Sequence, residues 1–413
     1  MSTGNINAVK RLHEEATVFL GCAYMSFELT REGLTYTLER SKGGIDITSM
    51  KAGCVDALFI SFGAEGIALA SYGPKAEDLF QQPTRRLYDL VFKGSDVIKR
   101  VLWDIDAMWR NAEALGNEVE IALSASDVLR INRQGKIAIF MHLTGGLIDR
   151  DLAVLRTYHR LGLRGIHIAC GDCVDWVDSC EGVAVCGGLS DFGREVVSEM
   201  NRLGMVIDLS HASDRTVKDV LDVSTQPVVV SHSSCRALVP LMRNVPDDLL
   251  EALARNGGVI GMHFHPLFLD RAYMNALIAT DYYDDYDCRA SAALSAKYKN
   301  PFELAAAMYK SDEWEMARIA AGLAPRVSSI ASVPPVPFDC LVDHIDHVVR
   351  VAGIDCVGLG TDYGGVPFPL EGLENVSKLA TLTAALLERG YSEEDVKKIL
   401  GGNFLRVLKT VTG

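Results

Sequence analysis

Short apolar runs recur along this chain, and a stretch with helical periodicity follows each of them. The runs are continuous rather than alternating, which is typical of strands buried on both faces of a parallel sheet. Eight such strands alternating with helices predict an α/β protein, a (β/α)₈ TIM-like barrel with distortions. The predicted strands are Thr17–Cys22, Asp56–Phe62, Ile137–His142, Gly165–Cys170, Val206–His211, Val228–His232, Val259–Phe264 and Cys356–Asp362.

Two connections between the predicted strands are much longer than the others. One spans about 63–136 and contains a helical segment around Leu87–Leu115; the other spans about 265–350 and contains an acidic aromatic patch at 280–287. Long connections of this kind in a barrel usually form lids or specificity loops. We therefore expect residues 1–413 to form a single barrel domain with two insertions.

Capping residues predict where several helices begin and end. A small polar residue before an amphipathic stretch, or a glycine after it, marks a helix terminus. The predicted helices are Phe192–Leu203 after Ser190, one that opens at Pro246 and stops at Gly257, and one from the capping box at Ser392 towards Leu408.

Composition and charge narrow the classes of partner. The 413 residues are 48% hydrophobic and carry a formal net charge of −13. This acidic balance argues against nucleic acid and against an anionic membrane surface as partners. The first residues lack the apolar stretch of a secretory signal, and the ten cysteines show no framework spacing. We therefore expect a cytoplasmic protein with reduced thiols.

Residues able to bind a metal or move a proton gather at the ends of the predicted strands. In a (β/α)₈ barrel the chemistry lies at the carboxyl ends of the strands. Any one of these histidines alone is more typical of a hydrogen-bonded core residue, but His211 and His232, each flanked by serines, together indicate metal binding. The residues at these ends are Cys22, Tyr24, His142, Cys170, His211, His232, His263, His265 and Asp362.

Five ordered blocks make the chain resemble the renal (membrane) dipeptidase family. The resemblance implies a distorted TIM barrel with two zinc ions and hydrolysis of dipeptides or related small amides, through water activated by the metal. Family members often form dimers, so a homodimer is a further expectation. The blocks are 187–213, 227–238, 243–250, 343–365 and 402–408, and residues 48–62 match more weakly.

Four residues of this chain match functional positions of that family. The resemblance implies that His211 and His232 are the two histidines of the second zinc. Asp362 matches the aspartate that handles the proton of the attacking water. Arg243 matches the arginine that holds the substrate carboxylate, for which a guanidinium fork is suited.

The chain departs from the family at the first zinc. Cys22 and Tyr24 stand where the family has a His-x-Asp, and Thr144 replaces the bridging glutamate. Cys170 aligns with the substrate-binding histidine. Because threonine is a poor ligand for a dication, we expect one zinc or similar divalent ion rather than two. His211 and His232 would hold it, with one or two further ligands from His263, His265, Asp362, Cys170 and Cys22.

The sequence thus favours a metal-dependent hydrolase acting on a dipeptide or another small acid. We assign catalytic roles to Asp362, Cys170, His263 and His265, substrate binding to Arg243, His142 and Tyr24, and metal binding to His211, His232 and Cys22. Two alternatives stay open at this point. One is non-hydrolytic acid and base chemistry by the exchanged residues, and the other is a catalytically inactive binding protein.

Overall fold

The computed structural model describes the greater part of the chain. The ranges described are 3–24, 27–30, 33–36, 45–62, 97–170, 174–181, 184–278, 334–364, 366 and 369–413. The first part of the 63–136 insertion, including the start of the predicted helical segment, lies outside them. The acidic aromatic patch at 280–287 does so too.

The described strands close into a parallel barrel, as the sequence predicts. The order is β4-β1-β11-β10-β9-β8-β7-β6, and pairing of β4 with β6 completes the ring. Each strand starts within a residue or two of its predicted start, and β7, β8, β10 and β11 end earlier than predicted. The barrel strands are β1 (Val18–Tyr24), β4 (Val55–Phe62), β6 (Ile137–Thr144), β7 (Leu163–His167), β8 (Val206–Asp208), β9 (Val229–Ser233), β10 (Val259–His263) and β11 (Val357–Gly360).

Three strands were not predicted. β5 (Val119–Ile121) pairs with the first residues of β6, whereas β7 pairs with the last ones. It belongs to the 63–136 insertion and extends the sheet beside β6. β2 (Phe27–Thr30) and β3 (Gly33–Tyr36) form a separate antiparallel pair.

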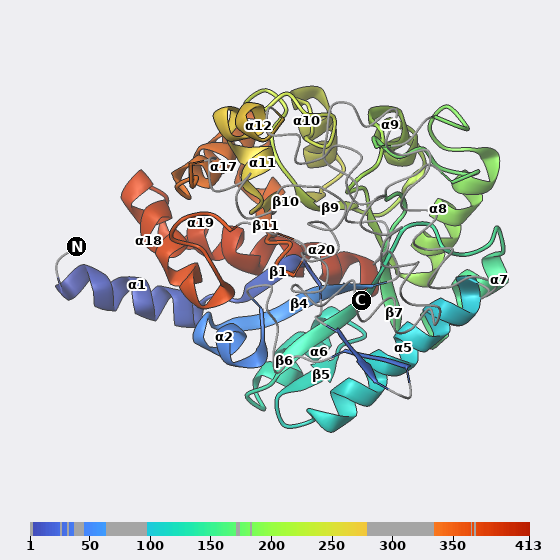
Figure 1. Cartoon of the computed structure of the whole chain (residues 1–413), viewed down its shortest axis with the longest axis horizontal. Helices are drawn as coiled ribbons and strands as arrows, with labels where there is room; N and C mark the ends of the chain where they lie inside the picture. Colours follow the sequence, from blue (N-terminus) through green and yellow to red (C-terminus); the bar gives the residue numbers. More distant parts are fainter. Residues whose placement is uncertain are drawn as a thin grey trace, which may run out of the picture.

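Helices surround the ring of strands, and the amino-terminal helix α1 packs against α18 at one edge of the molecule (Figure 1). None of the helices in the described part of the chain is long and apolar enough to span a membrane. The helices are α1 (Thr3–Glu15), α2 (Ile47–Ala52), α5 (Val97–Ala114), α6 (Ala125–Asn132), α7 (Leu152–Arg160), α8 (Asp191–Leu203), α9 (Asp214–Val223), α10 (Asp247–Arg255), α11 (Pro266–Leu269), α12 (Arg271–Ile278), α17 (Asp339–Ala352), α18 (Leu379–Arg389), α19 (Glu393–Lys397) and α20 (Asn403–Thr412).

The predicted caps are confirmed, with one correction. Ser190 accepts a hydrogen bond from the Gly193 amide at the start of α8, and Ser392 forms a capping box with Asp395. The helix expected to run on to Leu408 is interrupted between α19 and α20 by a π-type turn. At Gly401 the chain passes so close to β1 that a Cβ atom would lie 2.3 Å from the Thr17 carbonyl oxygen.

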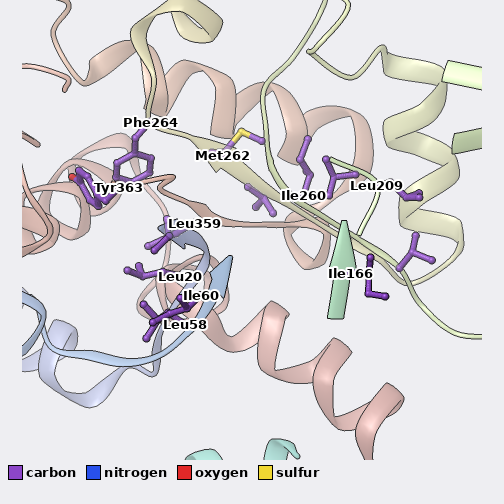
Figure 2. Packing of buried hydrophobic residues seen from close by; sticks show 14 of the residues in the cluster. Leu20, Leu58, Ile60, Ile166, Leu209, Ile260, Met262, Phe264, Leu359 and Tyr363 are labelled. Atoms are coloured by element: carbon purple, nitrogen blue, oxygen red, sulfur yellow. The ribbon is translucent and has the colours of Figure 1, made fainter. Parts of the chain in front are cut away.

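The two faces of the strands carry different cores. Side chains alternate along a strand, so one set packs against the surrounding helices and the other points into the barrel. Figure 2 shows part of the outer set, with Leu20 of β1, Leu58 of β4, Ile166 of β7 and Ile260 of β10 buried in one cluster.

The interior of the barrel changes from aromatic to polar along the strands. At the amino ends, Phe19 packs on Phe59 and on Phe404 of α20, with ring centroids 5.0 and 5.4 Å apart. Further along β6, Phe140 is followed two residues later by His142 on the same face. An apolar plug therefore closes one end, and the polar side chains lie towards the other, where a barrel carries its chemistry.

Candidate active site

The residues singled out by the sequence meet at the carboxyl end of the barrel. Cys22 and Tyr24 lie on β1, His232 on β9 and His263 at the end of β10, and Asp362 follows β11. Cys170 and His211 lie in the loops after β7 and β8, and Arg243 lies between β9 and α10. Apart from Tyr24, which is half-buried, all of them are buried.

His211 and His232 face each other. Their Nε2 atoms lie 3.1 Å apart, and both rings are almost fully buried. On its other side, His211 Nδ1 lies 2.8 and 2.9 Å from the two carboxylate oxygens of Glu181. Because a carboxylate accepts, Nδ1 carries the proton and Nε2 presents its lone pair towards His232. A carboxylate behind an imidazole is the usual support of a metal-binding histidine.

Burial keeps both imidazoles neutral. Loss of solvation lowers the pKa of His211 and of His232, and the nearby positive charge of Arg243 lowers both further. Neutral imidazole is the form that binds a metal. The pair is therefore in the protonation state that coordination requires.

The backbone at His211 and Asp362 is strained. Their φ angles are 67° and 55°, in the left-handed region that residues with a side chain rarely adopt. Such a conformation costs on the order of 1–3 kcal/mol and persists where the surroundings impose it. His211 lies three residues beyond the end of β8 and Asp362 two beyond the end of β11, so the strain accompanies the placement of their side chains over the barrel mouth.

Asp362 is held by two side chains from other strands. His263 Nδ1 accepts the His265 amide at 2.9 Å, so His263 Nε2 carries the proton and donates it to Asp362 Oδ2 at 3.0 Å. The Cys22 thiol donates to Oδ1 over 3.7 Å. Burial would raise the pKa of Asp362, but the bond from His263 and the charge of Arg243 outweigh it and lower the pKa.

The hydrogen bonds of His263 and His265 limit their use as further ligands of a metal ion. Ligand atoms of His232, His263 and Asp362 lie within 4.8 Å of one another, so the three are close enough to share an ion. However, backbone amides occupy Nδ1 of both His263 and His265. His263 Nε2 is further engaged as a donor to Asp362. In this arrangement His263 positions Asp362, and His265 caps α11.

The two thiols are protonated in their present surroundings. Burial raises the pKa of Cys22 well above its ordinary value, and the charge of Asp362 adds to the effect. Burial likewise raises the pKa of Cys170, with Glu181 as the next cause. Ligand atoms of Cys170, Glu181 and His211 lie within 4.8 Å of one another. Cys170 is therefore near the histidine pair, while Cys22 acts as a donor to Asp362.

Arg243 lies on the same side of the barrel as His211. Its Nε is 3.7 Å from the Glu181 carboxylate, and its guanidinium carbon lies 5.8 Å from the centre of the Phe268 ring. The Ser233 hydroxyl donates to the Arg243 carbonyl at 2.8 Å, which ties this loop to the end of β9. A buried guanidinium thus lies close to the metal-type pair.

Tyr24 and His142 lie apart from the other predicted site residues, Tyr24 half-buried at the end of β1 and His142 inside the barrel. The Tyr24 amide donates to the Tyr363 carbonyl at 2.8 Å, which links the end of β1 to the loop after β11. The ring of His142 is enclosed inside the barrel and stacks on Phe59 with centroids 4.9 Å apart. The substrate-binding roles assigned to these two residues stay predictions.

Sequence reasoning did not single out Glu181, His167 and Asp208. His167 and Asp208 end the described strands β7 and β8, three residues before the ends of the predicted strands at Cys170 and His211. Glu181 lies in a loop with no strand or motif signal. Its position is set by the hydrogen bond from the Cys180 amide to the His211 carbonyl, 2.8 Å long.

The donor set fits a divalent metal ion. Two neutral imidazole nitrogens 3.1 Å apart are at the separation expected for two ligands of one ion with bonds of about 2.0–2.1 Å. A carboxylate oxygen of Asp362 lies within 4.8 Å of a ligand nitrogen of His232, so this acid stands beside the pair. His211 and His232 would thus hold one ion, with Asp362 next to it.

Comparisons with known proteins identify the family of this chain. The family model described as membrane dipeptidase, Peptidase family M19, matches residues 6–413. Dipeptidase tcpJ of Claviceps purpurea is 34% identical over 371 residues, 89% of this chain and 69% of that protein. Mouse dipeptidase 3 is 32% identical over 76% of this chain, which spans only about half of that relative, 52%.

Solved structures of low sequence identity share the fold. The probable dipeptidase PvdM from Pseudomonas aeruginosa has a TM-score of 0.74 at 24% identity, covering 100% of this chain and 99% of its own. A metallo peptidase from Rhodobacter sphaeroides, liganded with a phosphinate mimic of L-Ala-D-Ala, has a TM-score of 0.63 at 21% identity and covers 96% and 99%. On the extent of the family match and the identity to its relatives, this chain belongs to the membrane dipeptidase family, Peptidase family M19, a family of metal-dependent dipeptidase-like hydrolases.

Proposed function

We propose that this protein hydrolyses a dipeptide or a similar small amide that bears a carboxylate, with a divalent metal ion held by His211 and His232. The observation that carries the proposal is the opposition of the two Nε2 atoms at 3.1 Å, with Glu181 behind His211. When bound, such an ion polarises the substrate carbonyl and lowers the pKa of a bound water.

Asp362 is the residue best placed to take a proton from the attacking water. Both of its oxygens receive hydrogen bonds from neutral donors, the His263 imidazole and the Cys22 thiol. These donors favour the carboxylate form, which can accept a proton, and fix its orientation within the barrel mouth. Cys22, which stands where the family has a metal-binding histidine, thus has a positioning part in this proposal.

Arg243 supplies the charge that recognises the substrate. A buried guanidinium binds a carboxylate more strongly than an exposed one, because water does not compete for it. Its Nε lies 3.7 Å from the Glu181 carboxylate, which balances the charge of the guanidinium. The relatives named as dipeptidases, and the neighbour liganded with a dipeptide mimic, support a dipeptide as the substrate class.

Nucleophilic catalysis by a thiol has less support. Attack needs the thiolate, and burial raises the pKa of both Cys22 and Cys170 well above ordinary values. Hydrolysis by activated water instead uses neutral imidazoles and the Asp362 carboxylate, which are the forms that this site favours.

The test is a panel of dipeptides incubated with the protein in the presence of Zn²⁺, with release of free amino acids as the readout. We expect turnover by the natural chain and a loss of at least about 100-fold in kcat/KM for His211→Ala. His159→Ala, on the surface helix α7, is the matched control and should retain full activity. Equal activity of His211→Ala and the natural chain would refute the proposal.

A further inference from the structure

Below His232, three side chains from neighbouring strands meet inside the barrel. His142 of β6, His167 of β7 and Asp208 of β8 have no exposed surface. Asp208 Oδ2 lies 2.8 Å from His167 Nε2 and 3.7 Å from His142 Nε2. A ligand atom of each residue lies within 4.8 Å of those of the other two. The proposed hydrolysis uses none of them.

His142 has no hydrogen-bond partner at either ring nitrogen among the described residues. Burial lowers its pKa to about 3, so the ring is neutral and offers a lone pair. Leaving a buried polar group unpaired costs on the order of 1–3 kcal/mol for each group. A buried imidazole with two unpaired nitrogens therefore calls for a ligand.

The neighbouring strand makes room for this ring. Gly165 of β7 pairs with His142, and a Cβ atom at that position would lie 2.2 Å from His142 Cδ2 and 2.6 Å from Nε2. Glycine inside a strand weakens it, so its presence marks a close approach. Here the imidazole of His142, which has no hydrogen-bond partner among the described residues, lies close to the backbone of Gly165.

The two carboxylate oxygens of Asp208 have different surroundings. Oδ1 accepts hydrogen bonds from the Ser210 amide, the Ser210 hydroxyl and the Ser231 amide at 2.9, 2.8 and 3.0 Å. Oδ2 has no well-aligned hydrogen bond despite its short distance to His167. The three bonds to Oδ1 fix the group so that Oδ2 points at the two imidazoles.

We propose that His142, His167 and Asp208 bind a second divalent transition-metal ion, of the zinc class, deep in the barrel. Two imidazoles and one carboxylate are a ligand set that such ions prefer. The separations of 2.8 and 3.7 Å fall within the span of two ligands on one ion with bonds of about 2.0–2.2 Å. This ion is structural, since its ligands are enclosed, and the chain acquires it on folding.

The deep ion is linked to the outer pair of histidines. The Ser231 hydroxyl lies 3.0 Å from His167 Nε2 and 2.9 Å from His232 Nδ1. It thus lies between a ligand of the deep site and the back of a ligand of the outer site. A buried water is the alternative occupant of this position, and with a water there the variants described below would hold as much metal as the natural chain.

The test is the zinc content per chain of protein produced in medium with Zn²⁺ and purified without chelator, measured by mass spectrometry. Asp208→Asn exchanges only the ligand atom, since Oδ1 keeps its three donors. His142→Gln is the second variant. We expect each to hold about one zinc ion fewer than the natural chain while keeping the ion that His211→Ala loses. In protein loaded with Co²⁺, the visible absorption should fall in the same two variants.

Asp222→Asn, exposed on α9, is the matched control and should hold as much zinc as the natural chain. Unchanged zinc content and Co²⁺ absorption in both Asp208→Asn and His142→Gln would overturn the inference. Zinc that is lost from these two variants but kept by His211→Ala would support the deep site while refuting the proposed function. The two proposals therefore fail separately.

Discussion

Glu181 Oε1 lies 2.8 Å from His211 Nδ1, on the side of the imidazole opposite to His232. This contact fixes which nitrogen of His211 carries the proton. Without it, the ring could present a proton instead of a lone pair to the ion. Glu181, in a loop without a sequence motif, thus sets the tautomer of His211, which the sequence indicated as a metal ligand.

Replacement of Glu181 by Gln should weaken metal binding. An amide can still accept from Nδ1, but it lacks the charge that makes the imidazole a stronger ligand, so we expect a loss of about 10–100-fold in Zn²⁺ affinity. Competition with a chromophoric chelator measures it. Glu195→Gln, on the surface of α8, is the control. An affinity of Glu181→Gln within twofold of the control would argue against a supporting role.

Arg243→Lys should affect substrate binding more than turnover. Lysine keeps the charge but loses the planar fork, so we expect KM for a dipeptide to rise by about tenfold or more with a smaller change in kcat. The corresponding dipeptide amide, which lacks the carboxylate, serves as the control substrate. Its KM should be the same for both proteins, and a similar rise for both substrates would show that Arg243 does not read the carboxylate.

Asp56 should make stability depend on pH. Burial raises the pKa of Asp56 to about 6, although the Val18 amide donates to it at 2.9 Å. The folded chain therefore binds this proton more tightly than the unfolded chain, and stability falls as pH rises from about 4 to 6.

The variant Asp56→Asn keeps an acceptor for Val18 and should lack that loss. Its stability relative to the natural chain should increase over the same interval, by up to about 3 kcal/mol, and then level off. Unfolding in urea at a series of pH values measures it. A difference between the two proteins that does not vary between pH 4 and 6 would contradict the assignment.

Gly165→Ala should destabilise the barrel through His142. The added methyl group would overlap the imidazole, so we expect a loss of about 1–3 kcal/mol. In the double variant with His142→Ala the overlap is gone, and the cost of the alanine at 165 should fall by most of that amount. A double-mutant cycle on unfolding free energies measures the coupling. Additive effects would mean that Gly165 does not serve to admit the ring.

The fold could be predicted largely because its strands are buried on both faces. Continuous runs such as Ile137–His142 have few competing interpretations once eight of them alternate with helices. β5 was not predicted because its three residues, Val119–Ile121, are too few to show a hydrophobic pattern. The break in the last helix was not predicted because it arises from contact of Gly401 with β1, which is remote in sequence.

The sequence indicated most of the residues that meet at the barrel mouth, but not Glu181. Strand ends indicated His211, His232 and Asp362, but not how their hydrogen bonds are shared. The bond from His263 to Asp362 joins residues 99 positions apart, and the proton on His263 is fixed by a backbone amide two residues away. Those relationships come from tertiary packing, and they distinguish His211 and His232, the proposed metal ligands, from His263, which positions Asp362.

The most direct test of the account is restoration of activity by metal in chelator-treated protein. The protein is depleted of metal, then titrated with Zn²⁺ while amino-acid release from a dipeptide is followed. We expect activity to be lost on depletion and to return on titration in the natural chain, whereas neither His211→Ala nor His232→Ala should recover it. Full activity after depletion, or recovery by these variants equal to that of the natural chain, would contradict the assignment of the metal to His211 and His232.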